Sequence, residues 1–205
     1  MGDSDGVLES INGRTGLLFL IAGGLFVVFA ALHGVEAFMN ESAPKDIFGP
    51  AGFAFAFLGM FGLYPRLVDR ARWLTQVGAV FATIGLVASA ITSIWHVGIW
   101  VAPAVTPAFF AALPAGMVLG QFLGYLPFGV ASLRAGVHSR TVGLLLIAVP
   151  AVLAVMIVTV ATGYATSGSA VVLGSVQALI HFAIGYTLRT DTIAKDRVTP
   201  TDTAA

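Results

Sequence analysis

Long apolar runs alternate with short polar segments along the whole chain. Two blocks contain no Asp, Glu, Lys or Arg: one lies between Arg72 and Arg134, the other between Arg140 and Arg189. A charge at mid-membrane costs roughly 2.5–3.5 kcal/mol on insertion scales, so charge-free blocks of this length indicate membrane spans. Each block is about twice the ~20 residues that one spanning helix needs. Each therefore predicts a hairpin of two helices.

The remaining apolar runs add one helix before the polar segment 39–46 and one after it. The pattern predicts an all-α, polytopic membrane bundle of six transmembrane helices, expected at about 15–38, 47–64, 74–97, 109–134, 141–162 and 170–188. The acidic start and the long first apolar run do not match a secretory signal, so we interpret this run as an uncleaved first helix. Residues 1–14 are expected to form a polar N-terminal segment, 15–188 the transmembrane domain, and 189–205 a disordered cytoplasmic tail.

Basic residues fall almost entirely on one side of this predicted bundle. Lys45 alone lies on the other side. The basic residues on the first side are Arg14, Arg66, Arg70, Arg72, Arg134, Arg140, Arg189, Lys195 and Arg197. Under the positive-inside rule this asymmetry predicts a multi-pass protein of the plasma membrane with both termini in the cytoplasm.

Small residues recur every four positions in the fourth predicted helix. Ala112, Gly116, Gly120 and Gly124 would form one smooth stripe, because residues i and i+4 lie one above the other on a helix. Such a glycine zipper lets a second helix approach closely within a membrane. The stripe is expected to pack inside the bundle or to contact a second copy or a partner subunit. Gly129 lies off the stripe, so a larger side chain there is expected to cost less.

Composition narrows the function classes. Hydrophobic residues make up 58% of the chain and charged residues 10%, against roughly 25% in soluble domains. The two charge signs cancel, so the lipid bilayer is the expected partner and nucleic acid is not. No cysteine is present, which excludes disulfides, thiolate metal sites and cysteine nucleophiles.

Two loop segments resemble those of small multi-helix membrane proteins of prokaryotes. They are GLYPRLVDRA at 62–71 and LRAGVHSRTVGLLL at 133–146. The resemblance is restricted to these loops and their flanks. It implies a six-helix integral membrane protein, and it carries no activity or site residue.

Few polar side chains fall within the predicted spans, so each is a candidate for ligand binding. An ionisable group kept inside a membrane is costly and therefore a functional hypothesis by default. Equally, a neutral imidazole can simply join helices through hydrogen bonds. The candidate ligand-binding residues are His33, Glu36, Trp95, His96, Gln121, Tyr125, Gln177 and His181.

Two of these histidines, His33 and His96, are predicted at similar depth near the outer ends of different helices. Glu36 shares a face with His33 because residues i and i+3 are helix neighbours. We hypothesise that the two histidines form one site, which would bind a metal, hold a haem or protonate a ligand headgroup. No set of metal ligands is assigned.

Several activities are argued against by missing groups. No span contains a lysine for a retinal Schiff base, and Glu36 is the only acid near a span. Walker-type and HExxH motifs are absent. No catalytic residues are assigned, and the pattern leaves open whether the protein is an enzyme.

Three hypotheses remain. The first is binding or transport of a small hydrophobic or amphipathic molecule such as a lipid or quinone. The second is an accessory or assembly subunit of a membrane complex. The third is a b-type haem or metal protein that uses His33, His96 or His181.

Overall fold

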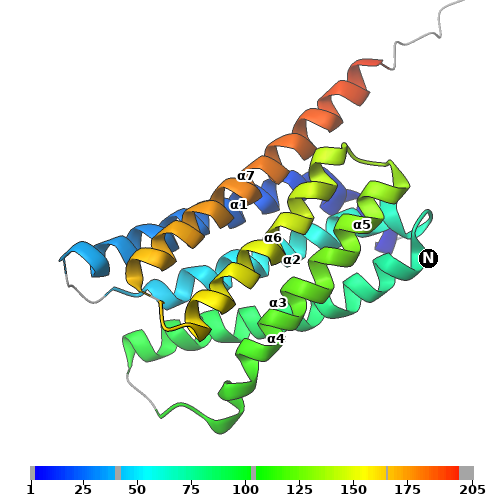
Figure 1. Cartoon of the computed structure of the whole chain (residues 1–205). Coiled ribbons are helices and arrows are strands. Elements are labelled where there is room, and N and C mark those ends of the chain that lie inside the picture. Colours follow the sequence, from blue (N-terminus) through cyan, green and yellow to red (C-terminus); the bar gives the residue numbers. More distant parts are fainter. Residues whose placement is uncertain (1–2, 40–42, 103–104, 165, 199–205) are drawn as a thin grey trace, which may run out of the picture.

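The computed structural model describes residues 3–39, 43–102, 105–164 and 166–198, with side chains described between 14 and 190. Within these residues the chain is helical and contains no strand (Figure 1). Its elements are α1 Asp3–Met39, α2 Lys45–Val68, α3 Arg72–Val101, the 3₁₀ helix η1 Ala108–Ala112, α4 Leu113–Leu119, the π-helix η2 Gly120–Gly124, α5 Tyr125–Ala135, α6 Arg140–Ala161 and α7 Ser167–Val198.

Six of these helical stretches are long and apolar enough to cross a membrane, which confirms the predicted fold. They are Arg14–Met39, Lys45–Val68, Arg72–Val101, Ala108–Ala135, Arg140–Ala161 and Ser167–Thr190. The fourth span consists of η1, α4, η2 and α5 in succession. The protein is therefore an integral membrane protein of the multi-pass type.

The six spans form a closed ring in which each span packs against its neighbours in sequence. α1 contacts α2, α2 contacts α3, and α3 contacts α4, η2 and α5. α5 then contacts α6, α6 contacts α7, and α7 closes the ring on α1. Large apolar residues such as Val80, Leu144 and Leu179 remain exposed on the bundle, where lipid would cover them.

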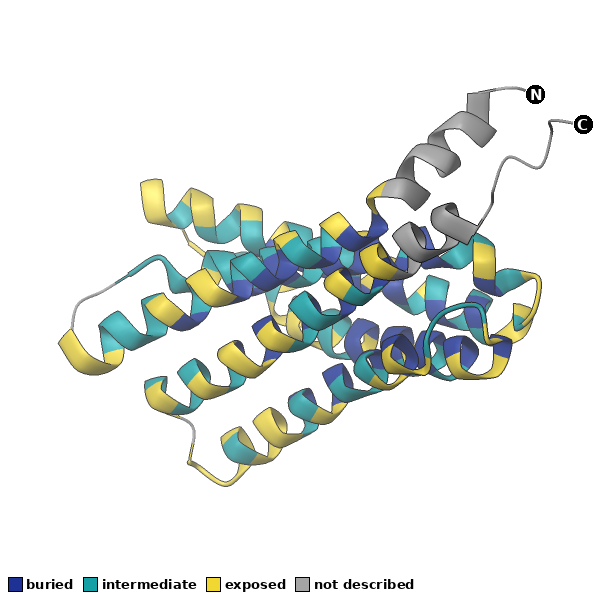
Figure 2. Ribbon diagram, turned by 90° about the horizontal axis from the view of Figure 1, so that it is seen from above, coloured by how far each residue is buried: buried dark blue, intermediate teal, exposed yellow. Residues whose placement is uncertain are grey.

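The two ends of the bundle, where the connecting segments lie (Figure 1), differ in the residues that they carry. The basic end carries the loops 69–71 and 136–139, and Arg70 Nη1 in the first loop donates a hydrogen bond to Ala135 O beside the second at 3.2 Å. At the opposite end, which we call the cavity end, α1 and α3 finish and α2 and α7 begin. Tightly packed core residues gather in the half of the bundle nearest the basic end (Figure 2); they include Leu63, Leu67, Phe128, Val142, Leu146 and Ile184.

The fourth span differs from the single regular helix that the sequence predicts. Pro114 lies in the first turn of α4, where its missing N–H is tolerated. Pro127 has no N–H to give to Leu123 O, and its ring would clash with that carbonyl in a regular α-helix. The chain instead widens into the π turn η2, and Tyr125 N–H bonds Gln121 O and Phe122 O. A π turn changes the register of the residues on either side of it.

Four other helices also extend well beyond their predicted limits. α1 begins at Asp3, α2 continues through Pro65 to Val68, α3 runs from Arg72 to Val101, and α7 continues to Val198. The sequence prediction placed a polar segment at 1–14 and a disordered tail at 189–205, because it took helix ends from the loss of apolar residues. Polar residues can also be helical in water. A helix can therefore continue beyond the segment that spans the membrane. Residues 199–205 lie outside the described residues.

The glycines of the fourth span approach α3 very closely. A Cβ added at Gly120 would lie 2.4 Å from Gly85 Cα, and one added at Gly116 would lie 3.1 Å from Ala88 Cβ. At Gly124 the nearest atom would be Ala82 N, at 3.3 Å. Ala112, the fourth residue of the predicted stripe, lies in η1 and is exposed. These contacts lie within one chain, so the glycines serve packing of α4 and η2 on α3.

Gly129, which lies off the stripe, is also closely packed, although its contacts are longer than those of Gly120. A Cβ there would lie 2.7 Å from Ile147 Cγ1 and 3.0 Å from Gly143 O, because α5 packs closely on α6 at this point. The sequence shows the stripe on one face of the fourth span, but it does not show which helix covers the other faces.

We expect Gly120→Ala to lower the free energy of unfolding by about 1–3 kcal/mol, because its methyl group would overlap the Gly85 backbone. Gly24→Ala is the matched control: a Cβ there has no neighbour within 4 Å. Replacing that helical glycine is expected to be neutral or to stabilise by about 0.5–1 kcal/mol. Thermal unfolding in detergent measures both. Equal stability of the two variants would contradict the close approach.

Candidate functional site

A cavity of about 400 Å³ lies inside the ring, between α1, α2, α4, η2, α6 and α7. It extends from the cavity end of the bundle down to the level of Gln121 and Gln177. Its walls are mainly apolar and include Phe26, Phe29, Phe53, Val118, Leu153 and Met156. The volume falls within the roughly 300–1,000 Å³ of small-molecule sites.

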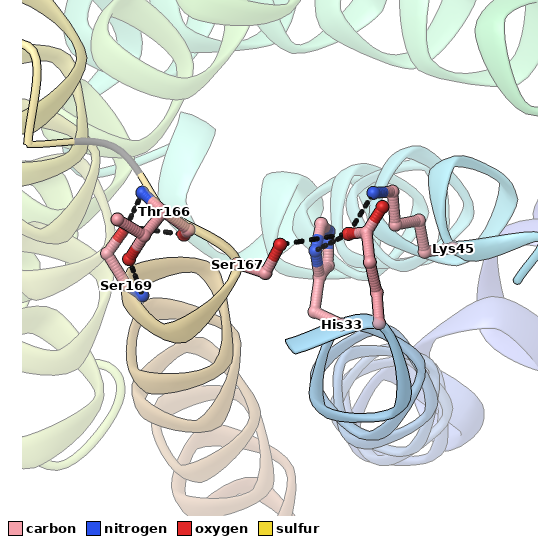
Figure 3. Close-up of polar contacts among 6 residues, drawn as sticks. His33, Lys45, Thr166, Ser167 and Ser169 are labelled. Atoms are coloured by element: carbon pink, nitrogen blue, oxygen red, sulfur yellow. Dashed lines mark hydrogen bonds and ion pairs between the residues drawn. The ribbon is translucent and has the colours of Figure 1, made fainter. Parts of the chain in front are cut away.

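A polar cluster joins three helices at the rim of this cavity (Figure 3). Glu36 at the end of α1 accepts hydrogen bonds from Lys45 Nζ at the start of α2 and from Ser167 Oγ at the start of α7, the latter at 3.0 Å. His33 Nδ1 lies 3.7 Å from the same Glu36 Oε2 atom. The predicted i, i+3 proximity of His33 and Glu36 is therefore present. Lys45 and Ser167, which we did not predict, complete the cluster.

The beginning of α7 is fixed by a reciprocal cap next to this cluster (Figure 3). Thr166 N donates to Ser169 Oγ at 2.9 Å, and Ser169 N donates to Thr166 Oγ1 at 3.1 Å. The Ser169 hydroxyl also donates to Thr166 O at 2.7 Å. This exchange satisfies two backbone N–H groups at a helix start, as in a capping box. It holds Thr166 and Ser169 at the cavity rim.

Two glutamines form the floor of the cavity, near the middle of the bundle. Gln121 comes from the π turn η2, and its residue surface is 3% exposed; Gln177 comes from α7 and is 6% exposed. Gln177 Nε2 donates to Val149 O on α6 at 3.4 Å. The Oε1 atoms of both glutamines are buried without a hydrogen-bond partner. Because a buried polar atom normally has a partner, both acceptors are candidates for ligand contact.

One turn further along α7, His181 is enclosed completely. Its Nδ1 lies 2.7 Å from Gln177 O, and its Nε2 lies 3.0 Å from the Tyr125 hydroxyl. A carbonyl can only accept, so Nδ1 carries the proton, Nε2 accepts, and the Tyr125 hydroxyl donates. Phe26 covers the ring, with the ring centroids 4.9 Å apart. Both nitrogens of His181 are thus occupied, and the pair ties α5 to α7 beneath the cavity.

His96 and Trp95 lie elsewhere. His96 Nδ1 is 2.8 Å from Thr92 O on its own helix, and its ring packs edge-on against Phe110 of η1. Trp95 also packs against Phe110. The partners of His33 belong to α1, α2 and α7, whereas those of His96 belong to α3 and η1. The structure therefore does not bring the two histidines into one site.

The eight predicted site residues divide into three groups. His33, Gln121 and Gln177 line the cavity, with Glu36 joined to its rim. Tyr125 and His181 form the sealed pair below the floor, and Trp95 and His96 lie against η1. Sequence reasoning missed Lys45, Asp46 and the Thr166–Ser169 cap. The S/T-x-x-S spacing before an apolar run is the signal that points to the cap.

No group of three or more His, Asp or Glu side chains that could hold a metal ion occurs among the described residues. Comparisons with protein-family models, with curated proteins and with solved structures find no match for this chain. The function must therefore be inferred from the cavity and its polar groups.

Tyr125→Phe is expected to lower the free energy of unfolding by about 0.5–2 kcal/mol, since it leaves His181 Nε2 buried without a donor. Tyr186→Phe is the control, because the Tyr186 side chain lies on the outside, 68% exposed. Thermal unfolding of both variants in detergent tests the difference. A Tyr125→Phe variant as stable as Tyr186→Phe would mean that the buried pair contributes nothing to stability.

Proposed function

We propose that this integral membrane protein binds a small hydrophobic or amphipathic molecule in the cavity between α1, α2, α4, η2, α6 and α7. The observation that carries the proposal is the coincidence of apolar walls with two buried, unpartnered carbonyl oxygens at the floor. Small-molecule sites have this form: an apolar enclosure with a few polar groups that fix orientation.

A route into the cavity from the membrane supports the same function. α4 contributes Met117 and Val118 to the lining, and α6 contributes Val152 and Met156. These two helices are not among the pairs that pack substantially against each other. Since the cavity lies between them, we infer that a molecule dissolved in the bilayer enters between α4 and α6.

The two alternative functions have less support. The glycine stripe was the reason to propose docking of a partner subunit, but Gly116, Gly120 and Gly124 already face α3 of the same chain. A haem held by two histidines would need both ligands in one place, and His33 and His96 have separate surroundings. His181 has no free ring nitrogen to offer.

Filling the cavity is expected to abolish binding. Val118→Trp places a large ring at a lining position, whereas Val172→Trp makes the same change on the outer face of α7, at a side chain 61% exposed. We expect mass spectrometry of the purified proteins to detect a co-purifying lipid-like molecule with the wild type and Val172→Trp. At least a tenfold loss is expected with Val118→Trp. The same molecule in equal amount with both variants would place binding outside the cavity.

We also propose that both termini lie in the cytoplasm and that the membrane is the plasma membrane. Support comes from the helix ends and loops of the basic end, which carry Arg66, Arg70, Arg72, Arg134 and Arg140. The cysteine-free chain allows a direct test. Val105→Cys, at a residue 92% exposed, is expected to react with an impermeant maleimide added to intact cells. Asp69→Cys, in the exposed loop at the basic end, is expected to react only after lysis. If Asp69→Cys reacts in intact cells and Val105→Cys reacts only after lysis, the orientation is the reverse of the proposed one.

A further inference from the structure

The polar groups that line the cavity can be sorted into hydrogen-bond donors and acceptors. Several donors are already used within the protein. Gln177 Nε2 donates to Val149 O, the Thr159 hydroxyl to Val155 O at 2.8 Å, and the Ser169 hydroxyl to Thr166 O. Lys45, the cation at the rim, is paired with Glu36. The donors named here are therefore occupied. His33 near the rim also lines the cavity, and its Nδ1 is buried without a hydrogen-bond partner.

Acceptors, in contrast, remain free at both levels of the cavity. Oε1 of Gln121 and Oε1 of Gln177 are unpartnered at the floor, and the Asp46 carboxylate lies at the mouth. The orientation of the Gln177 amide is fixed by its own contact, because turning it over would set Oε1 against the carbonyl of Val149. Ser89 and Ser132 also have buried unpartnered oxygens, but neither lines the cavity.

We propose that the cavity selects lipophilic alcohols, which enter with the hydroxyl group first and donate it to the free carbonyl oxygens of Gln177 and Gln121. This inference rests on the proposed function and adds the chemical class and orientation of the ligand. An acceptor-only head, such as a ketone, ester or ether, would leave these carbonyls unpaired. A buried group without a partner is costly, and this cost discriminates between two ligands of the same size.

The depth of the floor favours a neutral head over a charged one. Gln177 lies on α7 roughly 15 Å along the helix axis from Ser167, at about 1.5 Å per residue. The hydrocarbon core is about 30 Å thick, so the floor is near the bilayer centre. An ammonium or carboxylate head is expensive at that depth, and a carboxylate would also face free acceptors. A hydroxyl supplies the missing donor without a charge, and its alkyl chain then lies along the phenylalanine and methionine walls.

The test compares 1-decanol, 2-decanone and decylamine as probes of the full-length protein in detergent. A ligand that binds only the folded state stabilises it by RT ln(1 + L/Kd), where L is the free ligand concentration, and so raises the unfolding temperature. Thermal unfolding over a range of probe concentrations therefore gives each Kd. We expect 1-decanol to bind on the order of tenfold more tightly than 2-decanone or decylamine. The ligand series on the wild-type protein needs no variant to fold.

Two variants then assign the selectivity to the floor. Gln177→Met and Gln121→Met keep the length of the side chain and remove its carbonyl. Each is expected to weaken 1-decanol binding several-fold, while 2-decanone binding changes little, so the preference for the alcohol shrinks towards unity. Gln76→Met is the matched control, since Gln76 of α3 does not line the cavity. It is expected to keep the wild-type preference.

The outcomes separate this inference from the proposed function. If 2-decanone and 1-decanol bind equally and Val118→Trp removes both, the cavity binds lipophiles but the selection for a donor is wrong. If decylamine binds best, the neutral head is wrong. If no probe binds the wild-type protein, the alcohol class is excluded. The proposed function is judged separately, by the co-purifying molecule and its loss in Val118→Trp.

Discussion

Polar groups inside a membrane cannot rely on water, and the structure of this protein follows from that constraint. Threonines inside the spans donate to the carbonyl four residues before them, as Thr92 does to Ala88 O and Thr187 to Ala183 O. His181 has a partner on each ring nitrogen. Glu36, near the end of its span, accepts hydrogen bonds from Lys45 and Ser167 and lies next to His33. Some buried polar atoms nevertheless have no partner, and three of them belong to residues that line the cavity: Oε1 of Gln121, Oε1 of Gln177 and Nδ1 of His33.

The shape of the fourth span links packing to the site. Gly120 begins the π turn and lies against Gly85 of α3, while Gln121 follows it and lines the floor. Tyr125 ends the turn and reaches His181 on α7. The wide turn thus places one residue against α3, one in the cavity and one against α7. π turns of this kind are frequent at functional sites, and here the turn supplies half of the floor.

Packing also differs between the two ends of the bundle. Large side chains such as Phe128, Leu146 and Ile184 fill the half near the basic end, whereas the cavity occupies the half near the rim cluster. The rim is held by contacts among three helix ends: Glu36 with Lys45 and Ser167, and the Thr166–Ser169 cap. The cavity therefore lies in the less densely packed half of the ring, and the contacts among the helix ends hold its rim.

The apolar runs and the positions of charge are enough to predict a six-helix membrane bundle, because both follow from the energy of transfer into lipid. Polar residues inside spans are few, so Gln121, Tyr125, Gln177 and His181 could also be singled out in advance. Their surroundings depend on contacts between helices. Gln121 and Tyr125 are four residues apart, as are Gln177 and His181, so the two members of each pair are expected on one helix face. In each pair, however, the glutamine lines the cavity and the second residue is sealed below it. Helix spacing gives the face of a residue, but which helix covers that face depends on contacts between segments far apart in the chain. The same reason separates His33 from His96 and makes Gly129 a second point of close packing.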